Sequence, residues 1–252
     1  MTDDPGLLLV FLAALATALA TGLGALPLLF LRDASPRVLG TSTAMAGGLM
    51  LAATQLLLVE GVDISWTRTA WGVAGGIAAI WVIARFIHAG DGEEAADFGK
   101  LRGANARTAF LIIAVMTAHS AAEGIGVGVS FGGGEDLGIL VALAIAIHNI
   151  PEGLAISLAL VPHGSSVRSA AGWSIFSSLP QPLLAIPAFL FVEAFHGVLP
   201  IGLGVAGGAM LWMVLFELLP EAMGRARWPF VAAGLAGGYL VMLGFTVLLG
   251  GV

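Results

Sequence analysis

Two copies of one short pattern place histidine and glutamate inside apolar stretches of the sequence. One copy reads AHSAAEG and the other IHNIPEG, so both have the form His-x-x-x-Glu-Gly. Residues four positions apart on an α-helix lie on one face, one turn from each other. His119 should therefore stack on Glu123, and His148 on Glu152. If the two helices cross a membrane in opposite directions, the four side chains can converge on one site.

Carboxylates at the depth of these motifs need a compensating charge. A charge at the centre of a bilayer costs at least ~2.5–3.5 kcal/mol on insertion scales, and no lysine or arginine lies close to either motif. A divalent cation would neutralise both carboxylates, and two neutral imidazoles would complete four ligands. This donor set suits Zn²⁺, and also Cd²⁺, Fe²⁺ or Mn²⁺. Cysteine is absent, so thiolate ligands are excluded. A packed, hydrogen-bonded histidine would explain one motif, but it explains two copies poorly.

Long apolar segments carry these motifs. The chain is 58% hydrophobic and only 10% charged, whereas soluble domains carry about 25% charged residues. A membrane-spanning helix needs roughly 20 apolar residues. The sequence therefore predicts an all-α membrane protein with one transmembrane domain over residues 1–252 and a polar loop over 89–106. The eight predicted spans are 7–30, 38–59, 69–88, 107–130, 137–161, 169–194, 199–222 and 229–249.

The basic residues predict the orientation. In a chain with eight spans, nine of the ten basic residues fall on one side, and Arg68 alone falls on the other. Loops on the cytoplasmic side carry an excess of lysine and arginine, so we expect the loop 89–106 in the cytoplasm and both termini outside. The expected location is the cell membrane of a prokaryote, crossed several times. The nine residues are Arg32, Arg37, Arg85, Lys100, Arg102, Arg107, Arg168, Arg225 and Arg227.

A short internal repeat favours an inverted architecture. Residues 46–51 read AGGLML and residues 206–211 read AGGAML, and the second copy lies five predicted spans after the first. The two copies therefore cross the membrane in opposite directions, as inverted repeats do in many transporters. Chance, combined with the packing of small residues between helices, explains a six-residue match equally well.

The paired motifs resemble the ZIP (Zrt/Irt-like) family of divalent-metal transporters, in its bacterial GufA-like branch. The resemblance rests on HSAAEG followed by HNIPEG, on eight spans with outside termini, and on FELLPEA in the seventh span. It implies metal uptake toward the cytoplasm, with His119, Glu123, His148 and Glu152 as the primary site. It also implies a ZIP-type bundle, in which spans one, four, five and six move against a scaffold of spans two, three, seven and eight.

The sequence departs from this family at a second, adjacent metal position. Relatives use the residue after each motif histidine and a glutamate of the sixth span. Here those places hold Ser120, Asn149 and Gln181, the last within SSLPQPLLA. Neutral amide and hydroxyl oxygens are weaker ligands than a carboxylate. We therefore expect the second position to be poor or empty.

Other polar residues are candidates for the route of the metal. Glu217 and Glu221 lie one turn apart at the cytoplasmic end of the seventh span, and His163 lies near the inner end of the fifth. Glu60 and Asp63 lie at the outer end of the second span. Solvated helix ends explain these residues equally well, with Glu221 beside Arg225. The same applies to Glu193 and His196 outside, and to His88, Asp91, Glu93 and Glu94 in the loop.

The sequence thus predicts a transporter of divalent transition metals that works by alternating access. The metal is cargo, and we expect no cofactor. A metal-selective channel with the same ligands is the first alternative. An intramembrane zinc hydrolase is the second, but it needs an open metal position and a separate general base. Divalent ions and the lipid bilayer are the expected partners. A homodimer is possible. The net charge of −6 is spread over short loops and offers no surface for nucleic acid.

Overall fold

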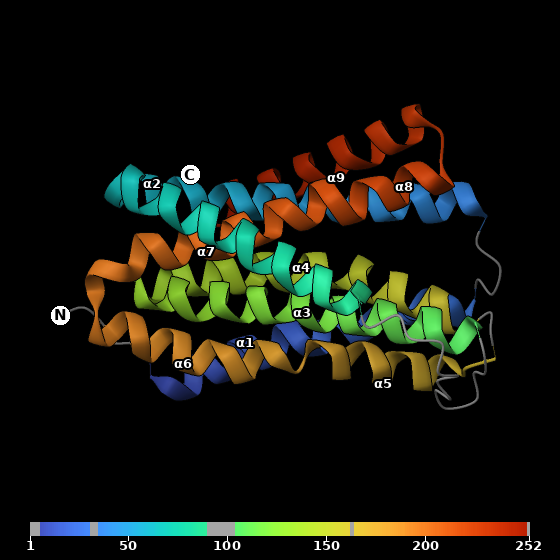
Figure 1. Ribbon diagram of the computed structural model, residues 1–252, viewed down its shortest axis with the longest axis horizontal. Helices are drawn as coiled ribbons and strands as arrows, with labels where there is room; N and C mark the ends of the chain where they lie inside the picture. The colour runs from blue at the N-terminus through green and yellow to red at the C-terminus, as the bar shows by residue number, and fades with distance from the viewer. Residues whose placement is uncertain (1–5, 31–34, 90–103, 162–163, 251–252) are drawn as a thin grey trace.

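The computed structural model describes residues 6–30, 35–89, 104–161 and 164–250, and every regular element within them is helical (Figure 1). Most of these helices are long and uniformly apolar, as helices within a bilayer must be. The elements are α1 (Leu7–Leu23), η1 (Leu26–Leu29), α2 (Pro36–Ala89), α3 (Ala104–Gly132), α4 (Glu135–Leu160), α5 (Val167–Ser178), α6 (Pro180–Ala194), η3 (His196–Val198), α7 (Leu199–Met213), the π-helical turn η4 (Val214–Leu218), α8 (Leu219–Arg225) and α9 (Trp228–Leu248).

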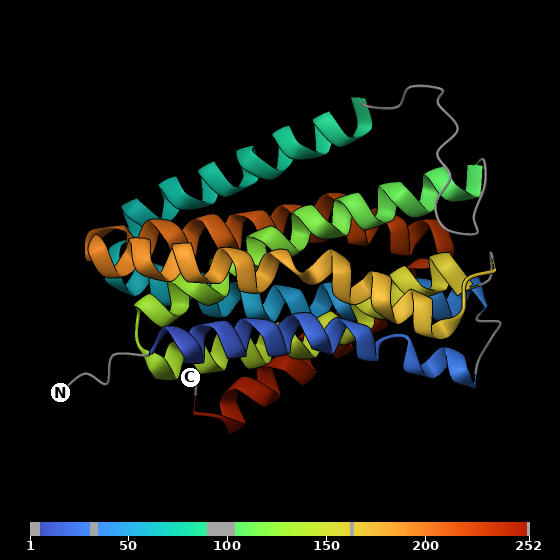
Figure 2. The same cartoon turned by 90° about the horizontal axis from the view of Figure 1, so that it is seen from below.

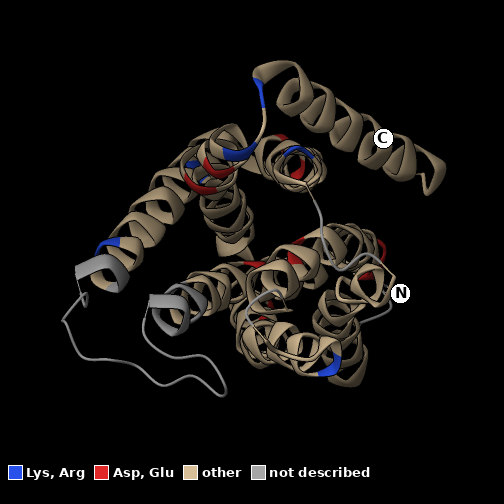
Figure 3. Cartoon of the chain, turned by 90° about the vertical axis from the view of Figure 1, so that its right-hand side faces the viewer, with Lys and Arg blue, Asp and Glu red and all other residues tan. Residues whose placement is uncertain are grey.

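The helices form two groups. In the first, α3 packs on α4, α5 and α6, and α1 packs on α4, α5 and α6. In the second, α2 packs on α7, α8 and α9. The view along the long axis shows the two groups side by side, with α3 in contact with α7 between them (Figure 3). This grouping agrees with the division that the resemblance implies, since α5 and α6 together cover the predicted sixth span.

The longest helix reverses direction at one residue. Ser65 has φ −165° and ψ 100°, which is extended backbone inside an otherwise helical segment. A Cβ atom on Gly61 would lie 2.8 Å from Oγ1 of Thr69, although eight residues of straight helix span about 12 Å. The hydroxyl of Thr69 donates to the carbonyl of Ser65 at 3.0 Å. The two arms of α2 therefore run back along each other (Figures 1 and 2).

Within the described residues, seven helices are long and apolar enough to cross a membrane. They are Leu7–Leu29, Pro36–Phe86, Ile112–Gly132, Glu135–Leu160, Val167–Ala194, His196–Arg225 and Trp228–Leu248. The second of these contains two of the predicted spans, 38–59 and 69–88. The difference between seven and eight spans therefore lies entirely in α2.

The two copies of the repeated AGG sequence make equivalent contacts. Gly48 lies against the backbone of α9 at Leu235, and Gly208 lies against the backbone of the second arm of α2 at Val73. The first glycine of each copy meets side chains instead: Gly47 lies near Val214 of η4 and Leu235 of α9, and Gly207 lies near Leu58 on the first arm of α2. In both copies the second glycine lets another helix approach to backbone contact. This equivalence favours an inverted repeat over chance.

Close contacts between glycine and backbone also hold the first group together. A Cβ atom on Gly124 of α3 would lie 2.6 Å from the backbone oxygen of Gln181 on α6. A Cβ atom on Gly153 of α4 would overlap the backbone carbonyl of Thr21 on α1. Both glycines directly follow a motif glutamate. The glutamates are therefore placed beside positions where a neighbouring helix comes into backbone contact.

Substitution of Gly153 by alanine tests this packing. We expect Gly153→Ala to lower the stability of the detergent-solubilised protein by about 1–3 kcal/mol, because rigid backbone must move to admit the methyl group. Gly172→Ala on α5 is the matched control, since nothing lies within 4 Å of its Cβ position, and alanine favours a helix there. Thermal unfolding of the two variants measures the difference. Equal melting temperatures would contradict the close contact.

The described basic residues gather at one end of the molecule. α2 begins, α5 begins, and α8 meets α9 at this end, which faces the viewer in Figure 3. α1 begins and α9 ends toward the opposite end (Figure 2). Arg68 lies at the turn of α2, also toward that opposite end, and donates to the carbonyl of Gly197 at 3.1 Å. The described residues at the basic end are Arg37, Arg85, Arg168, Arg225 and Arg227.

Candidate metal centre

The four motif residues meet between α3 and α4. Their potential ligand atoms all lie within 4.8 Å of one another, and all four side chains are buried. His119 and Glu123 come from α3, and His148 and Glu152 come from α4. Each pair lies one turn apart on its own helix, as the spacing predicts. Among the described residues, this is the single cluster of histidine and acidic side chains close enough to hold a metal ion.

The distances within the cluster suit a small tetrahedral ion. Nε2 of His119 lies 3.0 Å from Oε1 of Glu123 and 3.4 Å from Oε2 of Glu152. Zinc bonds of about 2.0–2.1 Å in tetrahedral geometry separate adjacent ligand atoms by roughly 3.3 Å. Nε2 of His148 is closer to Oε1 of Glu123, at 2.5 Å, a hydrogen-bonding distance. A small outward movement of this one pair would make room for an ion.

His119 is held in the form that can bind a metal. Its Nδ1 atom lies 2.7 Å from the sulfur of Met213 on α7. A thioether can only accept a hydrogen bond, so Nδ1 carries the proton and Nε2 keeps its lone pair. That lone pair is directed at the two glutamates. Fixing a tautomer through the second ring nitrogen is how proteins commonly orient a metal-binding histidine.

Glu152 lacks the partners that a buried carboxylate normally has. Its side chain is 5% exposed, and within the described residues neither oxygen has a hydrogen-bond partner. Nε2 of His119 lies 3.4 Å from its Oε2 atom. Buried polar groups left without partners are costly. A bound cation supplies the compensation that this carboxylate requires.

Unlike Glu152, Glu123 accepts a hydrogen bond from an amide side chain. Nε2 of Gln181 donates to Oε2 of Glu123 at 2.6 Å. The oxygen of the same amide accepts from Asn149 at 3.2 Å and from the hydroxyl of Thr17 at 2.5 Å. Asn149 also donates to the backbone carbonyl of Thr17 at 3.0 Å. Two of the three predicted secondary ligands therefore form a hydrogen-bonded chain that ends on Glu123.

The directions within this chain are fixed from one end. The carbonyl of Thr17 can only accept, so the amide nitrogen of Asn149 must point toward it and toward Oε1 of Gln181. The nitrogen of Gln181 then faces Glu123, and the carboxylate needs no proton of its own to complete the chain. Glu123 is thereby left with one oxygen, Oε1, directed at both histidines. Ser120, the third predicted secondary ligand, is fully buried and outside this chain.

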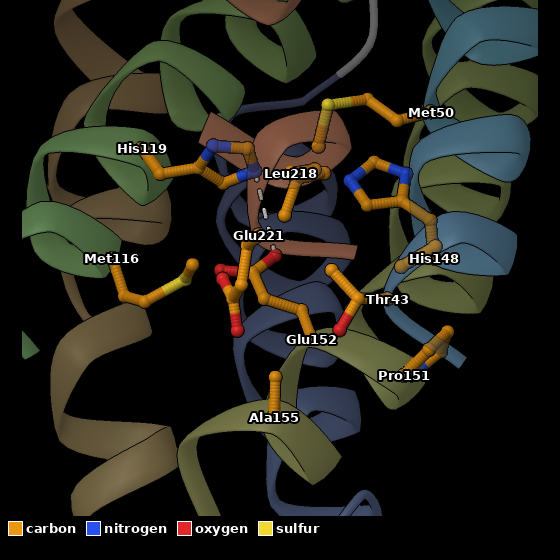
Figure 4. Close-up of a pocket in the computed structure, with 11 residues that line it drawn as sticks. Thr43, Met50, Met116, His119, His148, Pro151, Glu152, Ala155, Leu218 and Glu221 are labelled. Atoms are coloured by element: carbon orange, nitrogen blue, oxygen red, sulfur yellow. Dashed lines mark ion pairs between the residues drawn. The ribbon is translucent and has the colours of Figure 1, made fainter. Parts of the chain in front are cut away.

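Two neighbouring cavities lie between the cluster and Arg225, and they share the lining residues Met116, Ala155, Leu218 and Glu221. The first, about 20 Å³, is lined by His119, His148 and Glu152 and also by Glu221. In Figure 4 the imidazole rings of His119 and His148 face each other across this cavity, and the side chains of Glu152 and Glu221 reach into it. The second cavity, about 230 Å³, continues past Met116, Leu218 and Glu221 to Glu217 and Arg225. We call it the vestibule. Both predicted exit glutamates line it.

The other predicted route residues lie apart from the cluster. Asp63 lines a separate groove between α2 and α7, whose lining includes none of the four motif residues. Glu60 is also on α2, Glu193 is near the end of α6, and His196 is in η3. None of these four lines the cavities beside the cluster. The side chains of His163 and of the loop residues His88, Asp91, Glu93 and Glu94 lie outside the described part.

Several residues around the site are absent from the sequence prediction. Thr17 and Met213 contact it from α1 and α7, and Met50 and Met116 line the small cavity. A threonine or methionine in an apolar helix has no distinguishing spacing. The partners Thr17 and Gln181 are 164 positions apart in the sequence. Only the three-dimensional structure identifies them.

Known proteins resemble this chain over most of its length. The family pattern described as ZIP zinc transporter matches residues 82–250. The zinc transporter GufA of Myxococcus xanthus is 34% identical, over 94% of this chain and 98% of its own length. The zinc transporter ZIPB of Bordetella bronchiseptica is 30% identical, over 92% of this chain and 78% of its own.

A longer plant protein shows higher identity over one part of its sequence. It comes from Arabidopsis thaliana, is named as a candidate zinc transporter, and is 46% identical over 86% of this chain. The match with this chain covers only 35% of the plant protein, whereas the match with GufA covers nearly all of GufA. Helices apolar enough to cross a membrane, a buried His₂Glu₂ cluster and these relatives agree with one another. The chain belongs to the ZIP family of zinc transporters.

Proposed function

We propose that this protein carries Zn²⁺ across the cell membrane into the cytoplasm by alternating access, and that His119, Glu123, His148 and Glu152 bind the ion in transit. The observation that carries the proposal is the convergence of these four buried side chains with ligand atoms within 4.8 Å. Two carboxylates match the charge of one dication, and two imidazoles favour zinc over harder ions. Membership of the family points to a transporter rather than an enzyme.

The proposed direction rests on the cavities and the basic residues. The vestibule leads from the cluster to the end of the molecule where α8 meets α9. The described arginines other than Arg68 gather at this end (Figure 3), which the positive-inside rule assigns to the cytoplasm. In this arrangement the buried site would open toward the inside through the vestibule, and both termini would be outside. Movement of the α1/α3–α6 group against the α2/α7–α9 group would expose the site to the other side.

The proposal includes two crossings by α2. Its apolar segment, Pro36–Phe86, has 51 residues, and as one straight helix it would be about 76 Å long. A bilayer core is about 30 Å thick. Two arms joined at Ser65 fit that thickness, and they raise the count to eight spans.

The chain has no cysteine, so single-cysteine variants can test the topology. We expect Thr67→Cys, at the turn of α2, to react with a membrane-impermeant maleimide added to intact cells. Ser35→Cys and Phe86→Cys should react only after permeabilisation. If α2 crossed once, the last two would be labelled from opposite sides. The reverse pattern at all three positions would invert the proposed orientation.

Metal flux into proteoliposomes tests the function directly. We expect Zn²⁺ uptake that saturates with concentration, because each cycle must rearrange the protein around one bound ion. A panel of Zn²⁺, Cd²⁺, Fe²⁺ and Mn²⁺ gives the preference. Flux that rises linearly with concentration would indicate a metal-selective channel with the same ligands. Vesicles that take up none of these ions would refute the proposal.

A further inference from the structure

The vestibule contains one feature that metal passage does not require. Its polar lining consists of two acidic residues, Glu217 and Glu221, and one basic residue, Arg225. They follow one another at intervals of four, so all three lie along one side of η4 and α8. A fixed positive charge at the exit of a cation pathway repels the ion that must leave, so the position of Arg225 requires a physical reason.

The acidic pair lies between the buried cluster and the open end. Glu221 lines the small cavity together with His119, His148 and Glu152, and it also lines the vestibule. Glu217 lines the vestibule and a third small cavity shared with His119 and Met213. An ion that leaves the cluster therefore meets these two carboxylates next. Two carboxylates one turn apart can themselves retain a dication, which would delay its release.

Arg225 already binds one of these carboxylates. Nη2 of Arg225 lies 3.0 Å from Oε1 of Glu221, and both side chains are 36% exposed. The guanidinium is always charged, so it neutralises Glu221 under all physiological conditions. A partly exposed ion pair is only weakly favourable and exchanges readily. The pair can therefore open to let an ion pass and close again behind it.

Resting on the transport function proposed above, we propose that Arg225 is a tethered counter-ion that keeps the metal affinity of Glu217 and Glu221 low. It acts through Glu221 and is a positioning residue, not a metal ligand. When an ion enters the vestibule, the guanidinium competes with it for Glu221 and repels it. Without Arg225, Glu221 would lose the cation that neutralises it, and it could then bind a second ion together with Glu217 as the first one leaves.

Removal of this one charge tests the inference. We expect Arg225→Gln to bind a second zinc ion per chain about tenfold more tightly than the wild type does, with the first, tight equivalent unchanged. Equilibrium dialysis of the purified full-length protein with Zn²⁺ counts both equivalents. In proteoliposomes, zinc added on the vestibule side should inhibit transport by Arg225→Gln at about tenfold lower concentration.

Matched variants separate this role from general effects. Arg227→Gln removes the same charge two residues away, at the start of α9 and outside the vestibule lining, and it should behave as the wild type. Arg225→Lys keeps the charge and should also bind as the wild type. A structural role that needs the guanidinium would instead impair it. The double variant Glu221→Gln/Arg225→Gln should lose the second equivalent again.

Two results would overturn the inference. One is an Arg225→Gln variant that binds and transports zinc as Arg227→Gln does. The other is a second equivalent that survives in the double variant, since the ion would then lie elsewhere. Failure of the proposed function gives a different result: the wild type would lack the tight equivalent or would not transport zinc. The second equivalent in Arg225→Gln can still be counted in that case.

Discussion

Glu123→Gln and Glu152→Gln should each lower zinc affinity by about 100-fold to several thousand-fold and abolish measurable transport. Each change leaves the shape of the side chain nearly intact and removes one of the two charges that balance the ion. Removal of one partner from a buried ion pair costs about 3–5 kcal/mol, and each 1.4 kcal/mol corresponds to a factor of ten. Equilibrium binding and flux measured on the same preparations give the two effects.

Asp136→Asn is the control for this pair. Asp136 lies in the first turn of α4, the helix that carries Glu152, and a separation of sixteen positions corresponds to about 24 Å along the helix. This variant also loses one carboxylate and should bind and transport as the wild type. Glu152→Gln should remain folded, because Glu152 makes no hydrogen bond within the described residues that the change could break. Glu123→Gln should also remain folded, because its amide oxygen can still accept from Gln181. Normal zinc affinity in either glutamine variant would remove that residue from the site.

Local spacing carries enough information to pick out the four candidate ligands. His119 and Glu123, like His148 and Glu152, lie one turn apart through the geometry of a single helix, which the sequence encodes directly. Their convergence on one another is also foreseeable, since two adjacent apolar segments must run antiparallel. The expected separation of the two helix groups follows from the resemblance to the ZIP family. Periodicity alone does not reveal which helices pack together.

Long-range contacts set the limit of the sequence prediction. The orientation of Gln181 depends on Thr17 and Asn149, which come from two other helices. Nothing in the local sequence of α1 distinguishes Thr17 from any other threonine in an apolar helix. The turn of α2 is a similar case: the gap expected between residues 59 and 69 is helical on both sides of a single extended residue, Ser65. No glycine or proline marks that position.

The sequence predicts that Gln181 weakens the second metal position, and the structure adds a reason. The amide does more than fail to bind a cation. It donates a hydrogen bond to Oε2 of Glu123 at 2.6 Å and so occupies the side of that carboxylate on which a second ion would sit. A second dication would also bring two positive charges without a new anion, which is unfavourable in a site of low dielectric constant. We therefore expect one tightly bound zinc ion per chain.

Gln181→Glu should create a second tight site beside the first. The new carboxylate would face Glu123 and supply the charge that a second ion needs, and Asn149 would still donate to it from the far side. Equilibrium dialysis should then count two tight zinc ions per chain instead of one. Anomalous diffraction from metal-soaked crystals should place them about 4 Å apart, the usual spacing of paired metals.

Two variants control for the loss of the amide itself. Gln181→Met removes the hydrogen bonds without adding charge, and it should keep one zinc ion at lower affinity because Glu123 is no longer oriented. Glu123→Gln in the Gln181→Glu background should lose both tight ions, since the two positions share that carboxylate. Two fully occupied metal ions in the wild type would show that the amide of Gln181 does not block the second position. A Gln181→Glu variant that still binds a single ion would show that missing charge is not what prevents binding of a second metal ion.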